Sequence, residues 1–224
     1  MSLLVKICGL KTPEALDVAL IEGADMVGFV FFEPSPRNIT VPAARMLGER
    51  VKGKARKVAL SVNADDELLA ASIESLKPDI LQLHGQETPD RVVEVRARFG
   101  IPVMKALPIA SREDLSPTLV YAKAADWILF DARAPREATR PGGLGKTFDW
   151  QLLKNLDLAI PFMLSGGLDA SNVTEALRIT RAQAVDVSSG VERAPGVKDH
   201  DKIRAFVQAA RLAEAQLAKV KSTA

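Results

Sequence analysis

Residues 77–85 read KPDILQLHG. In this stretch, a short and mainly apolar run begins at Ile80, directly after Asp79. The same order, an aspartate followed by an apolar run, recurs in GADMVGFV (23–30) and AADWILFD (124–131). Short runs of this kind, bounded by turn residues, are typical of strands that are buried on both faces of a parallel sheet. The recurrence predicts a fold built from repeated units.

Such runs lie at residues 3–8, 26–31, 57–62, 80–85, 102–107, 127–132, 161–166 and 184–189. Amphipathic helices are predicted between and after them, over residues 12–23, 41–51, 64–76, 87–100, 111–124, 148–156, 169–180 and 198–218. Thr12, and Asp169 or Ser171, are N-cap signals, and Gly100 suits a helix end. Eight βα units fit a closed parallel (βα)8 barrel, the TIM barrel, better than an open doubly wound sheet, although the pattern alone allows both.

The length and composition favour one globular domain over residues 1–224, because α/β barrels of about 200 to 250 residues form single domains. Hydrophobic residues make up 47% and charged residues 26% of the chain. The 30 Lys and Arg residues oppose 28 Asp and Glu residues and are spread along the chain. A nucleic-acid-binding protein normally carries a basic stripe, so no nucleic-acid partner is expected.

The single cysteine cannot form an internal disulfide, and the N-terminus lacks the features of a secretory signal. No apolar run approaches the length of a membrane span. These features predict a cytoplasmic protein. A monomer or a weak homodimer is expected, although none of these features determines the oligomeric state. One cysteine and two distant histidines also give no metal-site spacing, so no metal is expected.

Polar residues near the strand ends are the candidate functional groups, because a parallel barrel carries its active site at the carboxyl ends of its strands. Alternation along each strand predicts which of them point inward. The inward candidates are Lys6 and Cys8 on the first strand, Gln82 and His84 on the fourth, Asp131 on the sixth, and Asp186 and Ser188 on the eighth. Taken singly, each also suits a buried structural role, and their convergence on one face favours a site.

Two glycine-containing loops predict an anion site. LSGGLDASNV places Ser165, Gly166 and Gly167 after the seventh run, and DVSSGVE places Ser188, Ser189 and Gly190 after the eighth. Backbone N–H groups in such loops bind phosphate, and barrels often use the loops after these two strands. Arg37 in FFEPSPRNI (31–39) follows the second strand, and its planar fork of donors suits a carboxylate.

Residues 132–147, ARAPREATRPGGLGKT, form the least regular stretch and are predicted to be a flexible loop that covers substrate as a lid. A phosphate-binding P-loop would need glycine where Arg140 stands, so GGLGKT is not one.

The ordered motifs KICGL, SPRNI, LQLHG, FDA, GGLGKTFDW, LSGGLDASNV and VDVSSGVE closely resemble those of the phosphoribosylanthranilate isomerase family, over about residues 4 to 207. The resemblance implies a (βα)8 barrel that carries out an Amadori rearrangement in tryptophan biosynthesis, without a cofactor. It implies Asp131 as general acid and Cys8 as general base, with Arg37, His84, Lys6 and Asp186 as substrate-binding residues. The phosphate would be held by Gly143, Gly166, Gly167, Ser188, Ser189 and Gly190.

Two departures from the family pattern affect the lid contacts: GGLG replaces the common GGTG, and Asn38 replaces a frequent tyrosine. The alternatives are another phosphate-binding barrel enzyme of histidine or tryptophan biosynthesis, or a non-catalytic barrel that binds a sugar phosphate. The histidine-pathway isomerase is expected to have aspartate in place of Cys8, so this residue discriminates between the enzymes. A thiol base also needs a nearby positive group to stabilise its thiolate, and Lys6 is a candidate.

Overall fold

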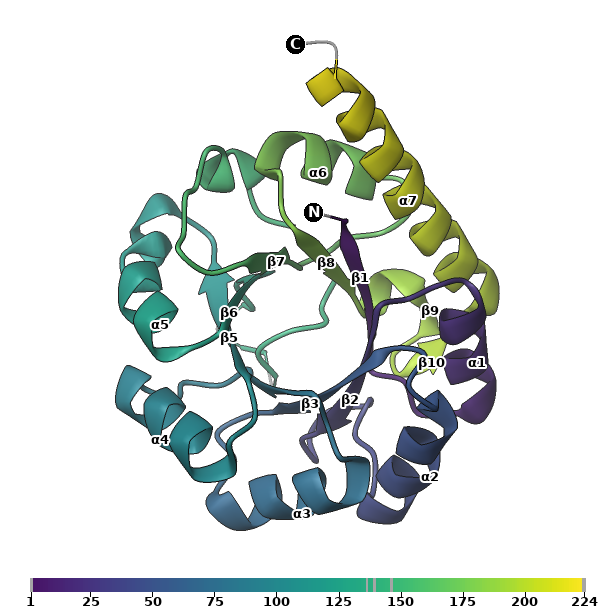
Figure 1. Ribbon diagram of the computed structural model, residues 1–224, viewed down its shortest axis with the longest axis vertical. Helices are drawn as coiled ribbons and strands as arrows, with labels where there is room; N and C mark the ends of the chain where they lie inside the picture. The colour runs from purple at the N-terminus through teal and green to yellow at the C-terminus, as the bar shows by residue number, and fades with distance from the viewer. Residues whose placement is uncertain (1, 136, 139, 146, 223–224) are drawn as a thin grey trace.

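In the computed structural model, eight parallel strands close into a barrel in the order β1 to β8, with β8 paired to β1 (Figure 1). The structure describes residues 2–222 except 136, 139 and 146. The strands are β1 (Leu4–Cys8), β2 (Met26–Phe31), β3 (Arg56–Ser61), β4 (Ile80–Leu83), β5 (Val103–Ile109), β6 (Trp127–Ala132), β7 (Phe162–Leu164) and β8 (Ala184–Val187). The predicted (βα)8 barrel is therefore confirmed, and an open sheet is excluded.

The helices form a ring outside the barrel (Figure 1). They are α1 (Pro13–Ile21), α2 (Val41–Val51), α3 (Asp66–Leu76), α4 (Pro89–Phe99), α5 (Thr118–Ala124), α6 (Val173–Thr180) and α7 (His200–Ser222). Short 3₁₀ turns occur at η1 (Arg112–Leu115), η2 (Trp150–Leu153) and η3 (Ser189–Val191). A short antiparallel hairpin of β9 (Glu192–Ala194) and β10 (Val197–Lys198) follows η3.

Three helix predictions were wrong in detail. The helix predicted over 111–124 is divided into η1 and α5, because Pro117 between them has no N–H group to continue the hydrogen-bond ladder. The helix predicted over 148–156 is only the 3₁₀ turn η2, which ends at the extended Lys154. Asn172, rather than Asp169 or Ser171, occupies the N-cap position of α6, so this helix begins later than predicted.

The recurring aspartates have one structural role. The side-chain Oδ2 atoms of Asp25, Asp79 and Asp126 accept the backbone N–H groups of Val5, Lys57 and Val103, at 2.7, 2.7 and 2.9 Å. Each of these aspartates also donates its own N–H to the carbonyl of the same partner. The residue that precedes β2, β4 or β6 is thereby fastened to the start of β1, β3 or β5, which explains why the motif recurs in alternate units.

The barrel interior is layered. Its amino-terminal part is filled by buried apolar side chains: Met26, Val58, Ile80, Met104, Ala106, Leu129, Met163 and Ala184. Above them lies a polar layer that contains the fully buried Lys6 and Gln82. Gly28 makes room for this layer, because a Cβ there would lie 2.8 Å from Cys8 Sγ and 3.2 Å from Lys6 Cε. The apolar cluster fills the barrel interior below the polar layer, so polar side chains inside the barrel are directed to its carboxyl-terminal end.

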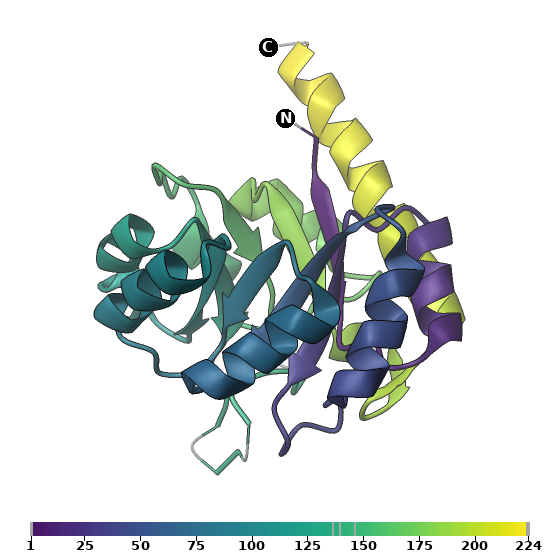
Figure 2. The same cartoon turned by 60° about the horizontal axis from the view of Figure 1, so that its bottom comes forward.

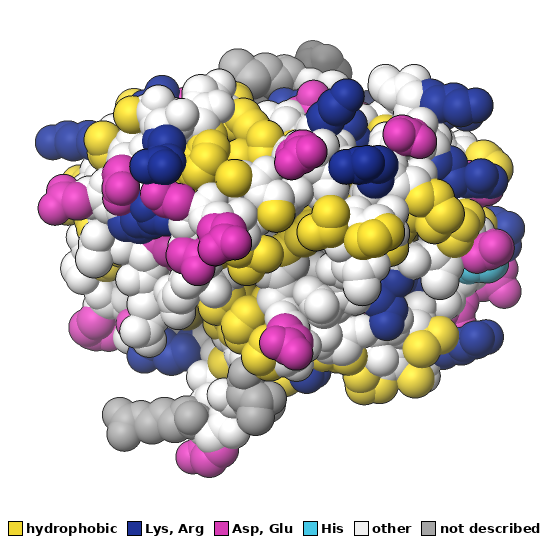
Figure 3. All heavy atoms as spheres, turned by 90° about the horizontal axis from the view of Figure 1, so that it is seen from below, with side chains coloured by type: hydrophobic (Ala, Val, Ile, Leu, Met, Phe, Trp, Pro, Cys, Tyr) yellow, Lys and Arg dark blue, Asp and Glu magenta, His cyan; other side chains and the backbone are white. Residues whose placement is uncertain are grey.

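Figure 2 shows α7 running past the barrel near the N-terminus, at the end opposite the loop that follows β6. No helix among the described residues is both long and apolar enough to cross a membrane. On the face in Figure 3, described side chains of both charge signs are interspersed with hydrophobic ones. Within that face, the described residues form no basic stripe of the kind that binds nucleic acid.

A buried ion pair fastens the loop that follows β4. Lys105 Nζ lies 2.9 Å from Glu87 Oε2 and also donates to the carbonyl of Gly85 at 2.7 Å. Glu87 in turn accepts the backbone N–H groups of Gly85 and Asn63. Because this loop begins at His84, the pair fixes the backbone beside the predicted site.

We expect Glu87→Gln to lower the free energy of unfolding by about 3–5 kcal/mol, because it removes the charge partner of the buried Lys105 ammonium. Urea denaturation at neutral pH measures the change. Glu175→Gln is the control, because Glu175 forms an ion pair with Arg178 on the surface of α6. Similar stability changes in the two variants would contradict the role given to the buried pair.

Candidate active site

A pocket opens at the carboxyl ends of the strands. The predicted site residues that line it are Cys8, Arg37, His84, Asp131, Gly143, Gly166, Gly167, Asp186, Ser188 and Ser189. The structure thus brings together residues of β1, β6 and β8 and of the segments that follow β2, β4, β6, β7 and β8, which are distant in the sequence. Lys6 and Gly190 do not line the pocket.

Cys8 ends β1 and is 3% exposed. Burial raises the pKa of its thiol, because the thiolate loses solvation. Positive charges oppose this effect without cancelling it; they belong to Lys6, Lys198 and Arg37. The thiol is therefore the stable form near neutral pH in the unliganded pocket.

Lys6 lies below the pocket rather than in its wall. In a strand, Lys6 is two residues, or about 6.6 Å, deeper than Cys8, and it is fully buried. Its Nζ lies 3.0 Å from Asp186 Oδ1 and donates to Gln82 Oε1 at 2.6 Å. Burial disfavours the ammonium, but the attraction of Asp186 and Cys8 outweighs burial and raises the pKa of Lys6. Lys6 is thus a fixed positive charge beneath Cys8, and direct contact with a substrate is not supported.

Asp131, at the end of β6, faces the pocket with both carboxylate oxygens engaged. Oδ1 accepts the backbone N–H of Ala132 at 2.9 Å, and Oδ2 lies 3.1 Å from His84 Nε2. Gly166, in the loop after β7, allows the backbone to approach this side chain, because a Cβ there would lie 2.5 Å from the Ala132 nitrogen and 3.1 Å from Asp131 Oδ1. The carboxyl group is held in one orientation at the pocket wall.

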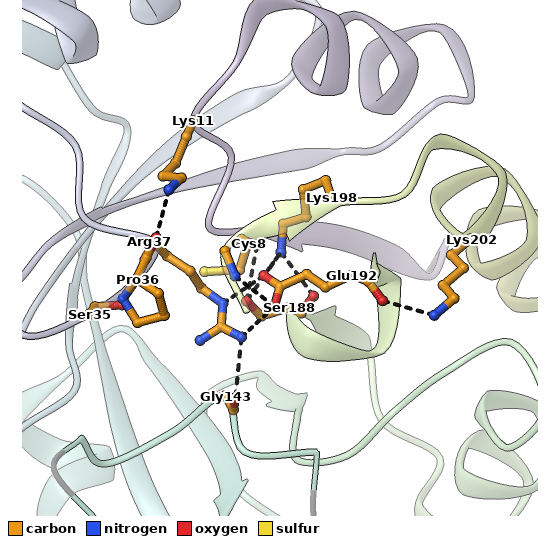
Figure 4. A network of polar contacts seen from close by, with 11 residues as sticks. Cys8, Lys11, Ser35, Pro36, Arg37, Gly143, Ser188, Glu192, Lys198 and Lys202 are labelled. Atoms are coloured by element: carbon orange, nitrogen blue, oxygen red, sulfur yellow. Dashed lines mark hydrogen bonds and ion pairs between the residues drawn. The ribbon is translucent and has the colours of Figure 1, made fainter. Parts of the chain in front are cut away.

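Arg37 is held by an acidic partner that the sequence interpretation missed. Its Nε and Nη2 donate to Glu192 Oε1 and Oε2 at 2.8 and 2.7 Å, and Nη2 also donates to the carbonyl of Gly143 at 3.2 Å. Figure 4 shows the guanidinium lying between Glu192 and Gly143. Two guanidinium nitrogens are therefore already engaged, and a substrate carboxylate would meet a guanidinium that is oriented in advance.

Lys198, on β10, is a second residue that the sequence interpretation missed. It is buried and donates to the carbonyl of Ser188 at 2.8 Å and to Glu192 Oε1 at 2.9 Å (Figure 4). Ser188 Oγ donates to the carbonyl of Cys8 at 3.2 Å. Burial lowers the pKa of Lys198, although the attraction of Glu192 opposes this. The β9–β10 hairpin thus ties the loop after β8 to the end of β1.

The predicted phosphate loops differ in how far they are free to bind an anion. The backbone N–H groups of Gly166 and Gly167 donate to no other described residue. The Ser188 hydroxyl is already used as a donor, and Gly143 contributes a carbonyl to Arg37. Gly190 packs against the Leu168 carbonyl outside the pocket wall. The backbone N–H groups of Ser189 and Gly190 likewise donate to no other described residue. The loops after β7 and β8 therefore both offer backbone anion donors, and Gly166, Gly167 and Ser189 line the pocket.

A Pro-Gly turn at residues 195–196 was the sequence signal for the β9–β10 hairpin, because such a turn between two short segments is typical of hairpins. The burial of Glu192 and Lys198 has no signal in one sequence. The segment predicted as a flexible lid, 132–147, includes positions 136, 139 and 146, which lie outside the described residues. Its described residues 140–145 line the pocket.

Comparison with known proteins identifies the family. A family model described as N-(5'-phosphoribosyl)anthranilate (PRA) isomerase matches residues 5–209. A Bradyrhizobium N-(5'-phosphoribosyl)anthranilate isomerase is 63% identical over 214 residues, which are 96% of this chain and 98% of the relative.

Two solved structures support the same family. The phosphoribosylanthranilate isomerase of Thermotoga maritima has a TM-score of 0.84 and 37% identity, over 93% of this chain and 98% of that one. A phosphoribosylanthranilate isomerase in complex with reduced 1-(o-carboxyphenylamino)-1-deoxyribulose 5-phosphate has a TM-score of 0.80 and 33% identity, with the same coverage of both chains. The barrel, its pocket and these matches together show that the chain belongs to the N-(5'-phosphoribosyl)anthranilate isomerase family.

Proposed function

We propose that this protein converts N-(5'-phosphoribosyl)anthranilate to 1-(2-carboxyphenylamino)-1-deoxyribulose 5-phosphate in tryptophan biosynthesis, with Asp131 as general acid and Cys8 as general base. The observation that carries the proposal is that both groups line one pocket in a chain of this family. The complex of a relative with a reduced form of this product gives further support.

In the first step, Asp131 donates its proton to the ribose ring oxygen, and the bond between that oxygen and C1 breaks to give an iminium. His84 and the Ala132 N–H each contact one carboxylate oxygen, so the transferable proton lies on a lone pair that neither contact uses. The same two contacts stabilise the carboxylate that remains after transfer. Asp131 is therefore held ready to release a proton toward the pocket.

In the second step, the Cys8 thiolate removes the proton from C2, and the electron pair of that bond forms a C1–C2 double bond and neutralises the iminium. The resulting enolamine takes up a proton at C1 and loses its hydroxyl proton to give the ketone. C1 is reduced and C2 is oxidised within one molecule, so the balance requires no external oxidant or reductant. Lys6, Lys198 and Arg37 supply the positive field that favours the thiolate.

The test of this function is the conversion of freshly generated phosphoribosylanthranilate, followed by the loss of anthranilate-type fluorescence. The purified protein is expected to accelerate the loss strongly over the uncatalysed rate. A protein that binds the reduced product analogue without accelerating conversion would instead be a non-catalytic sugar-phosphate-binding barrel.

The reactive thiol also bears on the compartment. A base that works as a free thiolate is lost on oxidation, and the cytoplasm keeps thiols reduced. We therefore propose a cytoplasmic location, which cell fractionation of the native host would test; recovery in an oxidising compartment would contradict it.

For substrate binding, we expect Arg37→Ala to raise KM about 10- to 100-fold with a smaller change in kcat, because charge-assisted hydrogen bonds contribute about 1.5–3 kcal/mol. Initial rates over a range of substrate concentrations measure the split. Glu192→Gln is the matched variant: it leaves the Arg37 charge in place but weakens its orientation, and a smaller rise in KM is expected. An unchanged KM in Arg37→Ala would exclude a carboxylate-binding role.

A further inference from the structure

Below the pocket, a chain of hydrogen bonds connects Lys6 to Asp131. Lys6 Nζ donates to Gln82 Oε1 at 2.6 Å, and Gln82 Nε2 lies 3.0 Å from His84 Nδ1. His84 Nε2 then lies 3.1 Å from Asp131 Oδ2. Lys6 and Gln82 are completely buried, so water does not replace either partner from outside. This series of hydrogen bonds links the Lys6 ammonium, beneath Cys8, to the proposed general acid Asp131.

The direction of every bond in this chain follows from its first member. An ammonium group only donates, so the Gln82 carbonyl oxygen must face Lys6 and the Gln82 amide nitrogen must face His84. The amide then donates to Nδ1, which must be unprotonated. The proton of the neutral imidazole therefore resides on Nε2, and His84 donates to Asp131. Asp186 stabilises the ammonium at the start of the chain.

We propose that Gln82 is a positioning residue that fixes His84 as the Nε2–H tautomer, so that His84 donates a hydrogen bond to Asp131 and does not accept its proton. This inference rests on the proposed role of Asp131 as general acid. A histidine of the opposite tautomer would present a bare nitrogen to Asp131 and compete with the substrate for the acidic proton. With Nε2–H in place, the proton is available only to the substrate.

The amide of Gln82 is needed because it combines one acceptor and one donor. In Gln82→Glu, one carboxylate oxygen accepts from Lys6 and the other faces Nδ1. The second oxygen requires a proton on Nδ1, so the tautomer reverses. In Gln82→Met, a side chain of similar length contacts His84 without a hydrogen bond, and neither tautomer is selected. The two variants therefore change the tautomer in different ways at nearly constant volume.

The experiment measures the ¹⁵N chemical shifts of the His84 ring together with kinetics. The chain has two histidines, so a His200→Gln background assigns the signals. Wild-type protein is expected to show the Nε2–H pattern, Gln82→Glu the Nδ1–H pattern and Gln82→Met a mixture. We expect kcat to fall about 100-fold in Gln82→Glu, in line with misplaced catalytic groups, and less in Gln82→Met, with little change in KM.

Gln208→Glu is the matched control, because Gln208 is exposed on α7 and the substitution adds the same charge away from the pocket. Its tautomer pattern and kcat are expected to equal those of the wild type. A wild-type Nδ1–H pattern, or an unchanged pattern in both folded Gln82 variants, would overturn the inference. Absence of isomerase activity in the wild type would instead refute the proposed function, while the NMR result would still test the tautomer.

Discussion

In a Cys8→Ala variant, kcat is expected to fall about 10²- to 10⁴-fold, the usual contribution of a general base. The variant removes the only thiol in the chain. Lys6, Asp186 and Arg37 remain, so the structure around position 8 is expected to be kept. Binding of the reduced product analogue should therefore change little. Fluorescence-detected turnover and calorimetric binding of that analogue measure the two effects separately.

The activity is also expected to rise with pH above neutrality. Burial raises the pKa of the Cys8 thiol, so only a minor fraction is thiolate at neutral pH in the free enzyme. The base is active when deprotonated, and kcat/KM must therefore increase as the pH approaches this raised pKa. Because Cys8 is the only cysteine, subtracting the ultraviolet absorbance of Cys8→Ala from that of the wild type follows the thiolate directly.

Cys8→Ser is the matched variant, since it keeps a side chain of similar size but replaces the thiol by a hydroxyl with a far higher pKa. Its kcat is expected to be as low as that of Cys8→Ala. Near-wild-type turnover in either folded variant would remove Cys8 from the mechanism. If kcat/KM does not follow the thiolate absorbance as the pH changes, ionisation of Cys8 does not control the catalytic step.

The barrel could be predicted because fully buried parallel strands leave a simple signal, a short apolar run between turn residues. The same alternation correctly pointed Cys8, His84 and Asp131 inward. It did not predict depth: Lys6 shares the face of Cys8 but lies one inward position lower, out of the pocket wall. The end of β4 was also misplaced, because His84 and Gly85 leave the sheet to begin the loop that Lys105 fastens.

The polar network of the site could not be predicted, because it depends on contacts between distant segments. Glu192 lies 155 residues from Arg37 in the sequence, yet it takes two of the guanidinium nitrogens. Gln82 was recognised as inward-facing, but its role depends on which amide atom faces the Lys6 ammonium. Charge and hydrogen-bond direction in a buried layer are properties of the folded chain, and one sequence carries no periodic signal for them.

In an Asp131→Asn variant, kcat is expected to fall at least as far as in Cys8→Ala, about 10²- to 10⁴-fold, because the general acid is lost. The local hydrogen bonding also changes. Asp131 Oδ1 accepts the Ala132 N–H, and Oδ2, 3.1 Å from His84 Nε2, accepts a hydrogen bond from the Nε2–H tautomer inferred above. An asparagine has one acceptor, so its amide nitrogen must oppose one of these donors. The measurements are steady-state turnover and the thermal unfolding temperature.

Asp126→Asn is the control: it removes a structural carboxylate beside the same strand without removing the proposed general acid. Asp126 precedes the same strand at its opposite end, where it accepts the Val103 N–H and pairs with Arg96 at 2.7 Å. This variant should unfold at a lower temperature and keep its kcat, whereas Asp131→Asn should lose kcat while it remains folded. If Asp131→Asn kept wild-type turnover, ring opening would need another proton donor, and the hydrogen bond from His84 would serve only to position a structural carboxylate.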